Sequence, residues 1–204
     1  EAHKTYPIGL PSPLDDAGHL HRAAYARAIA VGLIHPEDDL SRLQALYVPH
    51  WVMWKPEWTA RVRAFAEGGG TVLFSALTAT RTADNHIWAE QAPAAGVGDL
   101  AGVRVSEFGR VAEPGSDGLI PAGTEGYPGE HRPAHLPAAG SAQRGYQMMI
   151  GNREIDAAHL YERLDLAAGV EVLGRWSNRF LAGEPMLTAR KLGKGRVLYL
   201  GSYL

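Results

Sequence analysis

Residues 43–76 combine two short apolar segments with an amphipathic helix, and this pattern limits most strongly what the chain can fold into. Residues 43–48 are typical of a buried strand that stops at Pro49, and residues 71–76 of a second one. Between them a helix is expected to begin at Pro56 and to end at the three glycines 68–70. Strands and helices that alternate in this way predict an α/β fold with a parallel sheet covered by helices.

Further periodic segments are expected to add helices and strands to this unit. We expect a helix over 20–33 with Gly32 near its end, strands over 6–10, 146–150 and 170–176, and a helix end that feeds a strand within 99–105. We also expect a C-terminal β-hairpin in which 186–192 and 196–203 flank Gly193-Lys194-Gly195.

The segment 113–146 is rich in Pro, Gly and His and shows little periodicity. A stretch of this length predicts a long loop or an insertion. We expect residues 1–204 to form one α/β domain that contains it.

Composition excludes several classes of function. The 204 residues carry a formal net charge of -2, so no basic field predicts a nucleic acid or a membrane surface as a partner. With no cysteine, the chain has no disulfide, iron–sulfur cluster or thiol nucleophile. No apolar run approaches the roughly 18–20 residues of a membrane helix, and the first residues do not resemble a signal peptide, so we expect a cytoplasmic protein.

Histidines are the only residues that raise the question of a metal. His131 and His135 have the spacing of a zinc-binding pair, but Pro133 lies between them and argues against the helix that such a pair needs. His19 and His21 lie near the start of the chain. We therefore expect solvated loop histidines, no metal site and no cofactor.

Candidate catalytic residues are few. Ser75 ends a buried strand, but the glycines of the G-x-S-x-G nucleophile elbow do not flank it. His86 and Glu90 follow along the chain, and the sequence does not place them beside Ser75. Nothing distinguishes Glu107 and Glu113 as a glycosidase pair, and the chain has too few strand–helix units for an eightfold barrel. We therefore expect no catalytic residue.

Three tryptophans cluster where the first buried strand ends, at positions 51, 54 and 58. Their spacing fits residues that pack a helix on a core, and their density equally fits a surface for a partner or a sugar. Ligands of open α/β sheets bind at the carboxyl ends of the strands. The candidate interface or ligand edge therefore consists of Trp51, Trp54, Trp58, Arg81, Asp84, Asn85 and His86.

Several segments together resemble the middle domain of family 42 β-galactosidases. They are residues 24–29 (AYARAI), 38–40 (DDL), 46–49 (LYVP), 62–73, 82–85 (TADN), 100–107 (LAGVRVSE), 182–188 (AGEPMLT) and 193–201 (GKGRVLYLG).

That resemblance implies a trimerisation domain with a flavodoxin-like, three-layer fold similar to class I glutamine amidotransferases, with a mainly parallel sheet and the C-terminal hairpin. It also implies self-association as a trimer, and a separate catalytic barrel outside this chain that carries the catalytic glutamates. Amidotransferase activity is not expected, because its nucleophile is a thiolate and the chain has no cysteine.

The leading hypothesis is thus a non-catalytic assembly domain, whose parent enzyme hydrolyses β-galactosides. A carbohydrate or small-ligand binding module on the same fold is the alternative, and it predicts a concave pocket at the tryptophan edge. A third hypothesis, a serine hydrolase, requires Ser75 to lie within hydrogen-bonding reach of His86 or another histidine, and fails if Ser75 is buried against the sheet.

Overall fold

The computed structural model describes residues 13–111 and 146–203. The expected strand at 6–10 and nearly all of the 113–146 segment lie outside these residues. In chain order the elements are α1 (Pro13–Tyr25), β1 (Ala45–Val48), α2 (Pro56–Glu67), β2 (Thr71–Ser75), α3 (Val97–Ala101), β3 (Val103–Arg110), β4 (Gln147–Ile150), β5 (Arg153–Asp156), β6 (Ala158–Leu166), β7 (Glu171–Trp176), a 3-10 helix (Arg179–Leu181), β8 (Pro185–Leu192), β9 (Gly195–Leu200) and β10 (Ser202–Tyr203).

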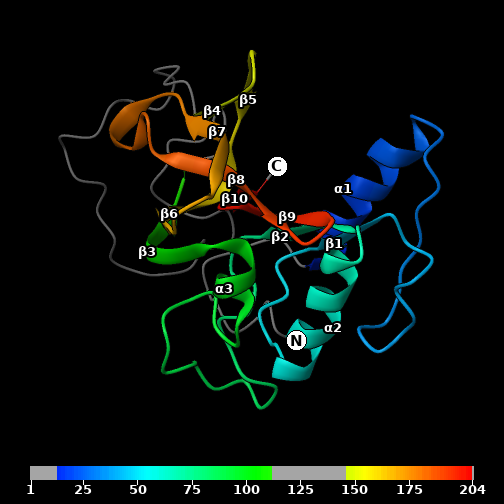
Figure 1. The fold of residues 1–204 in the computed structure, drawn as a ribbon. Coiled ribbons are helices and arrows are strands. Elements are labelled where there is room, and N and C mark those ends of the chain that lie inside the picture. The colour runs from blue at the N-terminus through cyan, green and yellow to red at the C-terminus, as the bar shows by residue number, and fades with distance from the viewer. Residues whose placement is uncertain (1–12, 112–145, 204) are drawn as a thin grey trace, which may run out of the picture.

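The strands form two sheets (Figure 1). The larger has seven strands in the order β1-β2-β9-β8-β7-β4-β5, and the smaller is the antiparallel set β10-β6-β3. Within the described residues, β1–β2 and β2–β9 are the parallel pairs, and the other four pairs of the larger sheet are antiparallel. The expected flavodoxin-like, amidotransferase-like fold with a mainly parallel sheet is therefore wrong: the structure is mostly strands in a mixed sheet and an antiparallel one.

Tight turns are the physical reason for the antiparallel pairing. Gly151 has a φ of 60° between β4 and β5, and Gly193 has a φ of 57° between β8 and β9. Two-residue turns of this kind reverse the chain, so the strands on either side pair antiparallel. The alternation that predicts a parallel sheet holds only for β1, α2 and β2. The expected C-terminal hairpin is confirmed by the β8–β9 pair.

Of the two expected helices, one is confirmed and one is wrong in its bounds. α2 runs from Pro56 to Glu67 as expected. The helix expected over 20–33 is instead α1, which ends at Tyr25, and the chain that follows is exposed. Packing supplies most of the stability of helices in proteins, and this exposed segment contacts no core that would support a longer helix.

The core fills the space between the larger sheet and the helices α2 and α3, which Figure 1 shows on one side of the sheet. Phe74 of β2 and Tyr199 of β9 are fully buried there, beside Ala66 of α2 and Leu100 of α3. A second cluster, which includes Trp176, lies under the antiparallel strands. The apolar face of α2 thus packs on the strands β1, β2 and β9 of the larger sheet.

A single buried carboxylate connects the two sheets. Glu162 of β6 accepts a hydrogen bond from the Leu77 backbone N–H, just after β2, at 2.9 Å. Its other oxygen accepts from the Tyr199 hydroxyl of β9 at 2.8 Å. Burial raises the pKa of Glu162 to about 7, because the two hydrogen bonds that favour the ionised form offset only part of the cost of removing its charge from water.

Glu162→Gln is expected to change how the stability of the fold depends on pH. The unfolded carboxyl releases its proton near pH 4.5 and the folded one near pH 7, so the wild type loses about 3 kcal/mol of unfolding free energy from this group as pH rises through that window. The glutamine side chain does not titrate, so the unfolding free energy of the variant does not fall for this reason as pH rises. Urea unfolding at pH 4.5 and pH 8 measures the difference.

The matched control is Glu171→Gln, which removes an exposed glutamate from β7. It is expected to follow the wild-type profile. Parallel pH profiles for Glu162→Gln and the wild type would contradict the assigned role of Glu162.

Candidate functional site

The ends of β1 and β2 bring a serine, a histidine and an aspartate together. Ser75 ends β2, and its Oγ lies 3.2 Å from Nδ1 of His50, which follows β1. The other ring nitrogen of His50, Nε2, lies 3.2 Å from an oxygen of Asp16 on α1. These are the residue types of a hydrolytic triad, and whether they could act as one depends on their burial and hydrogen bonds. Ser75 thus meets His50 and not His86.

The geometry excludes nucleophilic catalysis by Ser75. Its side chain is 0% exposed and that of His50 2%, and the His50 ring stacks on Tyr203 with 3.4 Å between the ring centroids. His50 Nδ1 also lies 2.9 Å from the Ala76 carbonyl oxygen, which can only accept, so this nitrogen carries a proton and cannot take one from Ser75. Because Ser75 is buried against the sheet, the serine hydrolase hypothesis fails.

The Asp16 carboxylate instead anchors α1 to the edge of the sheet. It accepts a hydrogen bond from the Tyr47 hydroxyl of β1 and faces His50. Burial works to raise the pKa of Asp16, but the hydrogen bonds with His50 and Tyr47 outweigh it and the pKa is lowered. Burial and the neighbouring Asp16 raise the pKa of Tyr47, so its hydroxyl keeps its proton and donates.

The expected interface or ligand edge is formed by two segments that lie side by side. The Trp54 backbone N–H donates to the Arg81 carbonyl oxygen at 2.9 Å, and Met53 and Arg81 form a parallel bridge. Trp51 is exposed, Trp54 is buried in the core, and Trp58 and Arg81 are half-buried. Asp84, Asn85 and His86 are exposed in the turn that follows Arg81.

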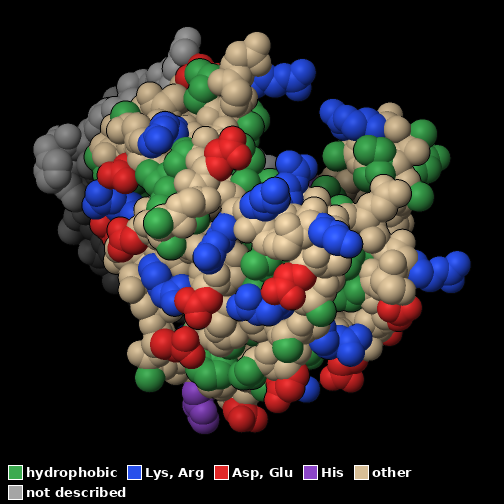
Figure 2. Space-filling model, in the orientation of Figure 1, with side chains coloured by type: hydrophobic (Ala, Val, Ile, Leu, Met, Phe, Trp, Pro, Cys, Tyr) green, Lys and Arg blue, Asp and Glu red, His purple; other side chains and the backbone are tan. Residues whose placement is uncertain are grey.

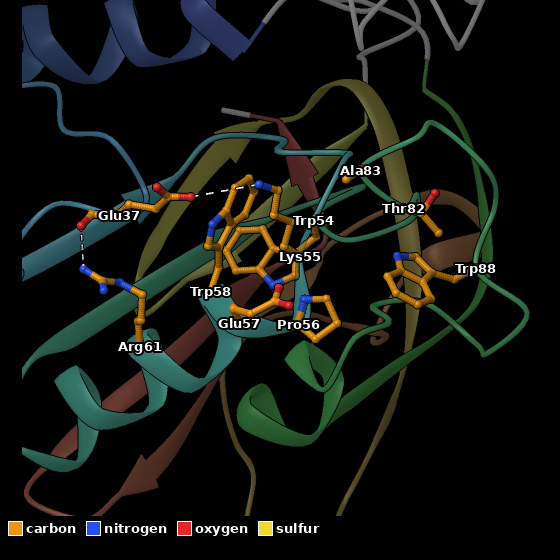
Figure 3. A pocket seen from close by; sticks show the side chains of 10 residues that line it. All are labelled: Glu37, Trp54, Lys55, Pro56, Glu57, Trp58, Arg61, Thr82, Ala83 and Trp88. Atoms are coloured by element: carbon orange, nitrogen blue, oxygen red, sulfur yellow. Dashed lines mark hydrogen bonds and ion pairs between the residues drawn. The ribbon is translucent and has the colours of Figure 1, made fainter.

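A hollow of about 690 Å³ opens beside these two segments (Figure 3). We name it the tryptophan hollow. Figure 3 shows Trp54 and Trp58 on one side of it and Trp88 with Thr82 on the other. It is lined by Glu37, Trp54, Lys55, Pro56, Glu57, Trp58, Arg61, Thr82, Ala83 and Trp88.

Trp54 and Trp58 are therefore the two members of the expected edge that line the hollow. Sequence reasoning missed Trp88, Glu37 and Arg61, which come from loops and from α2. In the sequence, Trp88 is marked only by its aromatic side chain, and Glu37 and Arg61 only by their charges.

Aromatic faces and charges alternate in the tryptophan hollow. The Trp54 and Trp58 rings meet edge to face, with 5.5 Å between their centroids, and Lys55 Nζ lies 5.4 Å from the Trp58 ring centroid. Arg61 donates to the carbonyl oxygen of Glu37 at 2.8 Å. The Trp88 Nε1–H is buried and has no hydrogen-bond partner among the described residues. Such a surface suits stacking with a sugar ring or with a partner's side chain.

Other candidate residues do not assemble into a site. In the described ranges 13–111 and 146–203, no three His, Cys, Asp or Glu side chains are placed to hold a metal ion. His19 lies on α1, and His131, His135 and Glu113 lie outside the described residues. Glu107 pairs with Arg163 at 3.4 Å and accepts from the Tyr161 hydroxyl at 2.6 Å. No helix among the described residues is long and apolar enough to cross a membrane.

Asp16→Asn is expected to lower the unfolding free energy by about 1–3 kcal/mol at pH 7, because the variant removes the negative charge that faces buried His50 and accepts from the Tyr47 hydroxyl. The lowered pKa of Asp16 gives stability that is present above the ordinary value of 3.8 and is lost as pH falls through the folded value below it. The gap between variant and wild type should therefore narrow toward pH 2.5.

Urea unfolding at the two pH values checks this expectation, with Asp15→Asn, an exposed carboxylate one residue away, as the control. An equal loss for both variants would show that Asp16 does not anchor α1.

Comparison with known proteins places this arrangement in context. The family model described as "Beta-galactosidase trimerisation domain" matches residues 10–204. Beta-galactosidase LacZ of Heyndrickxia coagulans is 23% identical over 197 residues, which cover 96% of this chain and 25% of that protein. A beta-galactosidase of Arthrobacter sp is 25% identical over 190 residues, covering 93% of this chain and 22% of the relative. The chain thus spans about a quarter of the length of the curated relatives it matches.

Solved structures show the same fold at low identity. The crystal structure of a beta-galactosidase from Bacillus circulans sp. alkalophilus superposes with a TM-score of 0.75 and 19% identity, covering 97% of this chain and 26% of that one. The exo-beta-1,4-mannosidase Op5Man5 from Opitutaceae bacterium strain TAV5 gives a TM-score of 0.55 at 15% identity, covering 95% of this chain and 28% of that one. At these identities the likeness concerns the fold alone.

Proposed function

The chain belongs to the beta-galactosidase trimerisation domain family, and we propose that it assembles a larger enzyme that hydrolyses β-galactosides. The observation that carries this proposal is the family match over residues 10–204, in a chain that spans only about a quarter of its relatives. Catalysis would then belong to a barrel domain outside this chain. The role of this domain would be contact between copies.

The geometry of the sheet edge supports a non-catalytic role. The Ser75, His50 and Asp16 side chains are all buried, and neither the tryptophan hollow nor the hollow beside Leu43 and Phe65 is lined by Ser75. A nucleophile needs access to its substrate and an unprotonated base beside it. This edge therefore serves the fold by holding α1.

We further propose that the partners are other copies of the same chain, three in the assembly, and the catalytic barrel. Nucleic acid and membrane are not proposed as partners, because the net charge of -2 gives no basic field. A cytoplasmic location remains a prediction from the sequence. The expected edge at Trp51, Arg81, Asp84, Asn85 and His86 stays a proposed contact surface.

The assembly proposal predicts the mass of the chain in solution. Size-exclusion chromatography with light scattering should give a mass three times that of the 22.0 kDa chain, unchanged over a hundredfold dilution. Beta-galactosidase activity should be absent from the same sample. A stable monomer would contradict self-sufficient assembly.

The tryptophan hollow favours a second candidate function, a carbohydrate or small-ligand binding module. Its three indoles and flanking charges resemble the lining of sugar sites, and the Trp88 Nε1–H is a donor without a protein partner among the described residues. Occupancy of the hollow would not require catalysis. The two candidate functions do not exclude one another.

Titration with galactose tests this second function. Binding is expected to shift the tryptophan fluorescence, and Trp58→Ala should abolish the shift, because Trp58 is the half-buried ring that lines the hollow. Trp51→Phe, which changes an exposed tryptophan outside the hollow, is the control and should keep the shift. No fluorescence change up to millimolar galactose would remove the sugar-binding proposal.

A further inference from the structure

An exposed apolar segment follows α1, and we name residues 25–34 the apolar arm. All of its residues are exposed. Its large apolar side chains are Tyr25, Ile29, Val31, Leu33 and Ile34. Leu33 is 85% exposed. A contiguous apolar stretch of this kind marks an interaction surface.

The arm has two parts: the amides of residues 26–29 are hydrogen-bonded in the turn that follows α1, and those of residues 30–34 are not. The amides of residues 30–34 donate to no described residue. Ile29, Val31 and Leu33 alternate, so in an extended chain they share one face. Residues 30–34 of the arm therefore have the side-chain pattern of a strand, and their backbone amides have no partner among the described residues.

The structure also contains a sheet edge without a strand. β1 lies at the end of the seven-stranded order, and β2 is its only strand neighbour among the described residues. Ala45 is exposed, and Leu46 and Tyr47 are half-buried. An open edge of this kind is a template for strand addition.

The arm and β1 of the same copy do not pair. Figure 1 shows the arm running down the flank beyond β1. In Figure 2, α1 and the chain beside it form a lobe at the upper right, separated from the body by a hollow and carrying hydrophobic side chains. The arm is thus held outward, and its position suits contact with another molecule.

Resting on the proposed assembly role, we propose that the apolar arm of one copy adds as a strand to the edge of β1 in a second copy, where no described strand pairs with it. Residues 31–34 and β1 are both four residues long, about 13 Å each when extended. The side chains of the added strand would lie beside those of β1 on the same face of the sheet. The occupant of this edge is therefore a second copy of this chain.

The symmetry of such a contact agrees with a trimer. The arm and the β1 edge are different surfaces on each copy, so the contact is head-to-tail and not two-fold. A head-to-tail contact closes into a ring when its rotation permits. Three copies, each giving one arm and receiving one, satisfy every arm and every edge.

Leu33→Asp tests the arm in the whole 204-residue chain. Its side chain is exposed, so the variant should keep the wild-type circular dichroism and melting temperature, while the mass by light scattering should fall from three protomers to one. Phe108→Asp is the matched control, because Phe108 is 51% exposed on β3 and belongs neither to the arm nor to the edge at residues 81–86. That variant should remain at three protomers.

Disulfide trapping tests the pairing itself, since the chain has no cysteine of its own. Leu33→Cys is co-expressed in one tagged copy with Gln44→Cys, Ala45→Cys or Leu46→Cys in a copy with another tag, so that three successive positions sample the register. Each copy carries one cysteine, so a disulfide between the two tags joins two copies. A cross-link requires Cα atoms within about 7 Å.

The outcomes separate this proposal from the assembly proposal on which it rests. A disulfide between position 33 and the β1 positions, with a monomeric Leu33→Asp variant, supports the arm contact. A trimeric Leu33→Asp variant, or a disulfide only between two copies of position 33, overturns it and leaves the assembly role standing. A monomeric wild type overturns both.

Discussion

The position of β9 between β2 and β8 in the larger sheet is the constraint on which the rest of the structure depends. β9 pairs parallel with β2 on one side and antiparallel with β8 on the other, so it joins the two kinds of sheet. Its approach requires glycine. A Cβ on Gly195 would lie 2.1 Å from the Gly70 carbonyl oxygen, and one on Gly193 would lie 2.7 Å from Glu67 backbone atoms. The hairpin turn therefore packs directly on the end of α2.

The same arrangement explains why the sheet edge is not an active site. Ligands of α/β sheets usually bind where parallel strands end. Here that edge holds His50 and Ser75, and Asp16 and Tyr203 close over the His50 ring. Beyond the end of β2, Glu162 of β6 accepts hydrogen bonds from the Leu77 backbone N–H and from the Tyr199 hydroxyl. These polar groups contact one another inside the fold, and the surfaces left for function lie outside it.

Local sequence patterns predicted the elements whose ends are set by residues within or next to them. α2 has a proline at its start and glycines after its end, and the β8–β9 hairpin has its turn residues, so both were predictable. The type of sheet was not, because apolar strand segments look alike whether their neighbours are parallel or antiparallel. β6 was missed because Glu162, Arg163 and Asp165 interrupt its apolar pattern.

The candidate site shows the same limit. Trp54 and Trp58 were predictable from their clustering, whereas Trp88 and Glu37 reach the tryptophan hollow from loops whose paths no local pattern specifies. His50 was missed as the partner of Ser75, although both follow or end neighbouring parallel strands. The carboxyl ends of adjacent parallel strands meet at one edge of a sheet. Because His50 follows β1 and Ser75 ends β2, their positions in the sequence favour His50 over His86 as the neighbour of Ser75.

The central claim is that copies of this domain meet through residues 30–34 and β1, and hydrogen–deuterium exchange tests it most directly. The amides of residues 30–34 have no partner among the described residues of one copy. The account predicts that these amides and those of β1 are protected in the wild-type oligomer and exchange rapidly in the Leu33→Asp variant. Rapid exchange of residues 30–34 at every concentration, in a sample that remains oligomeric, would contradict it.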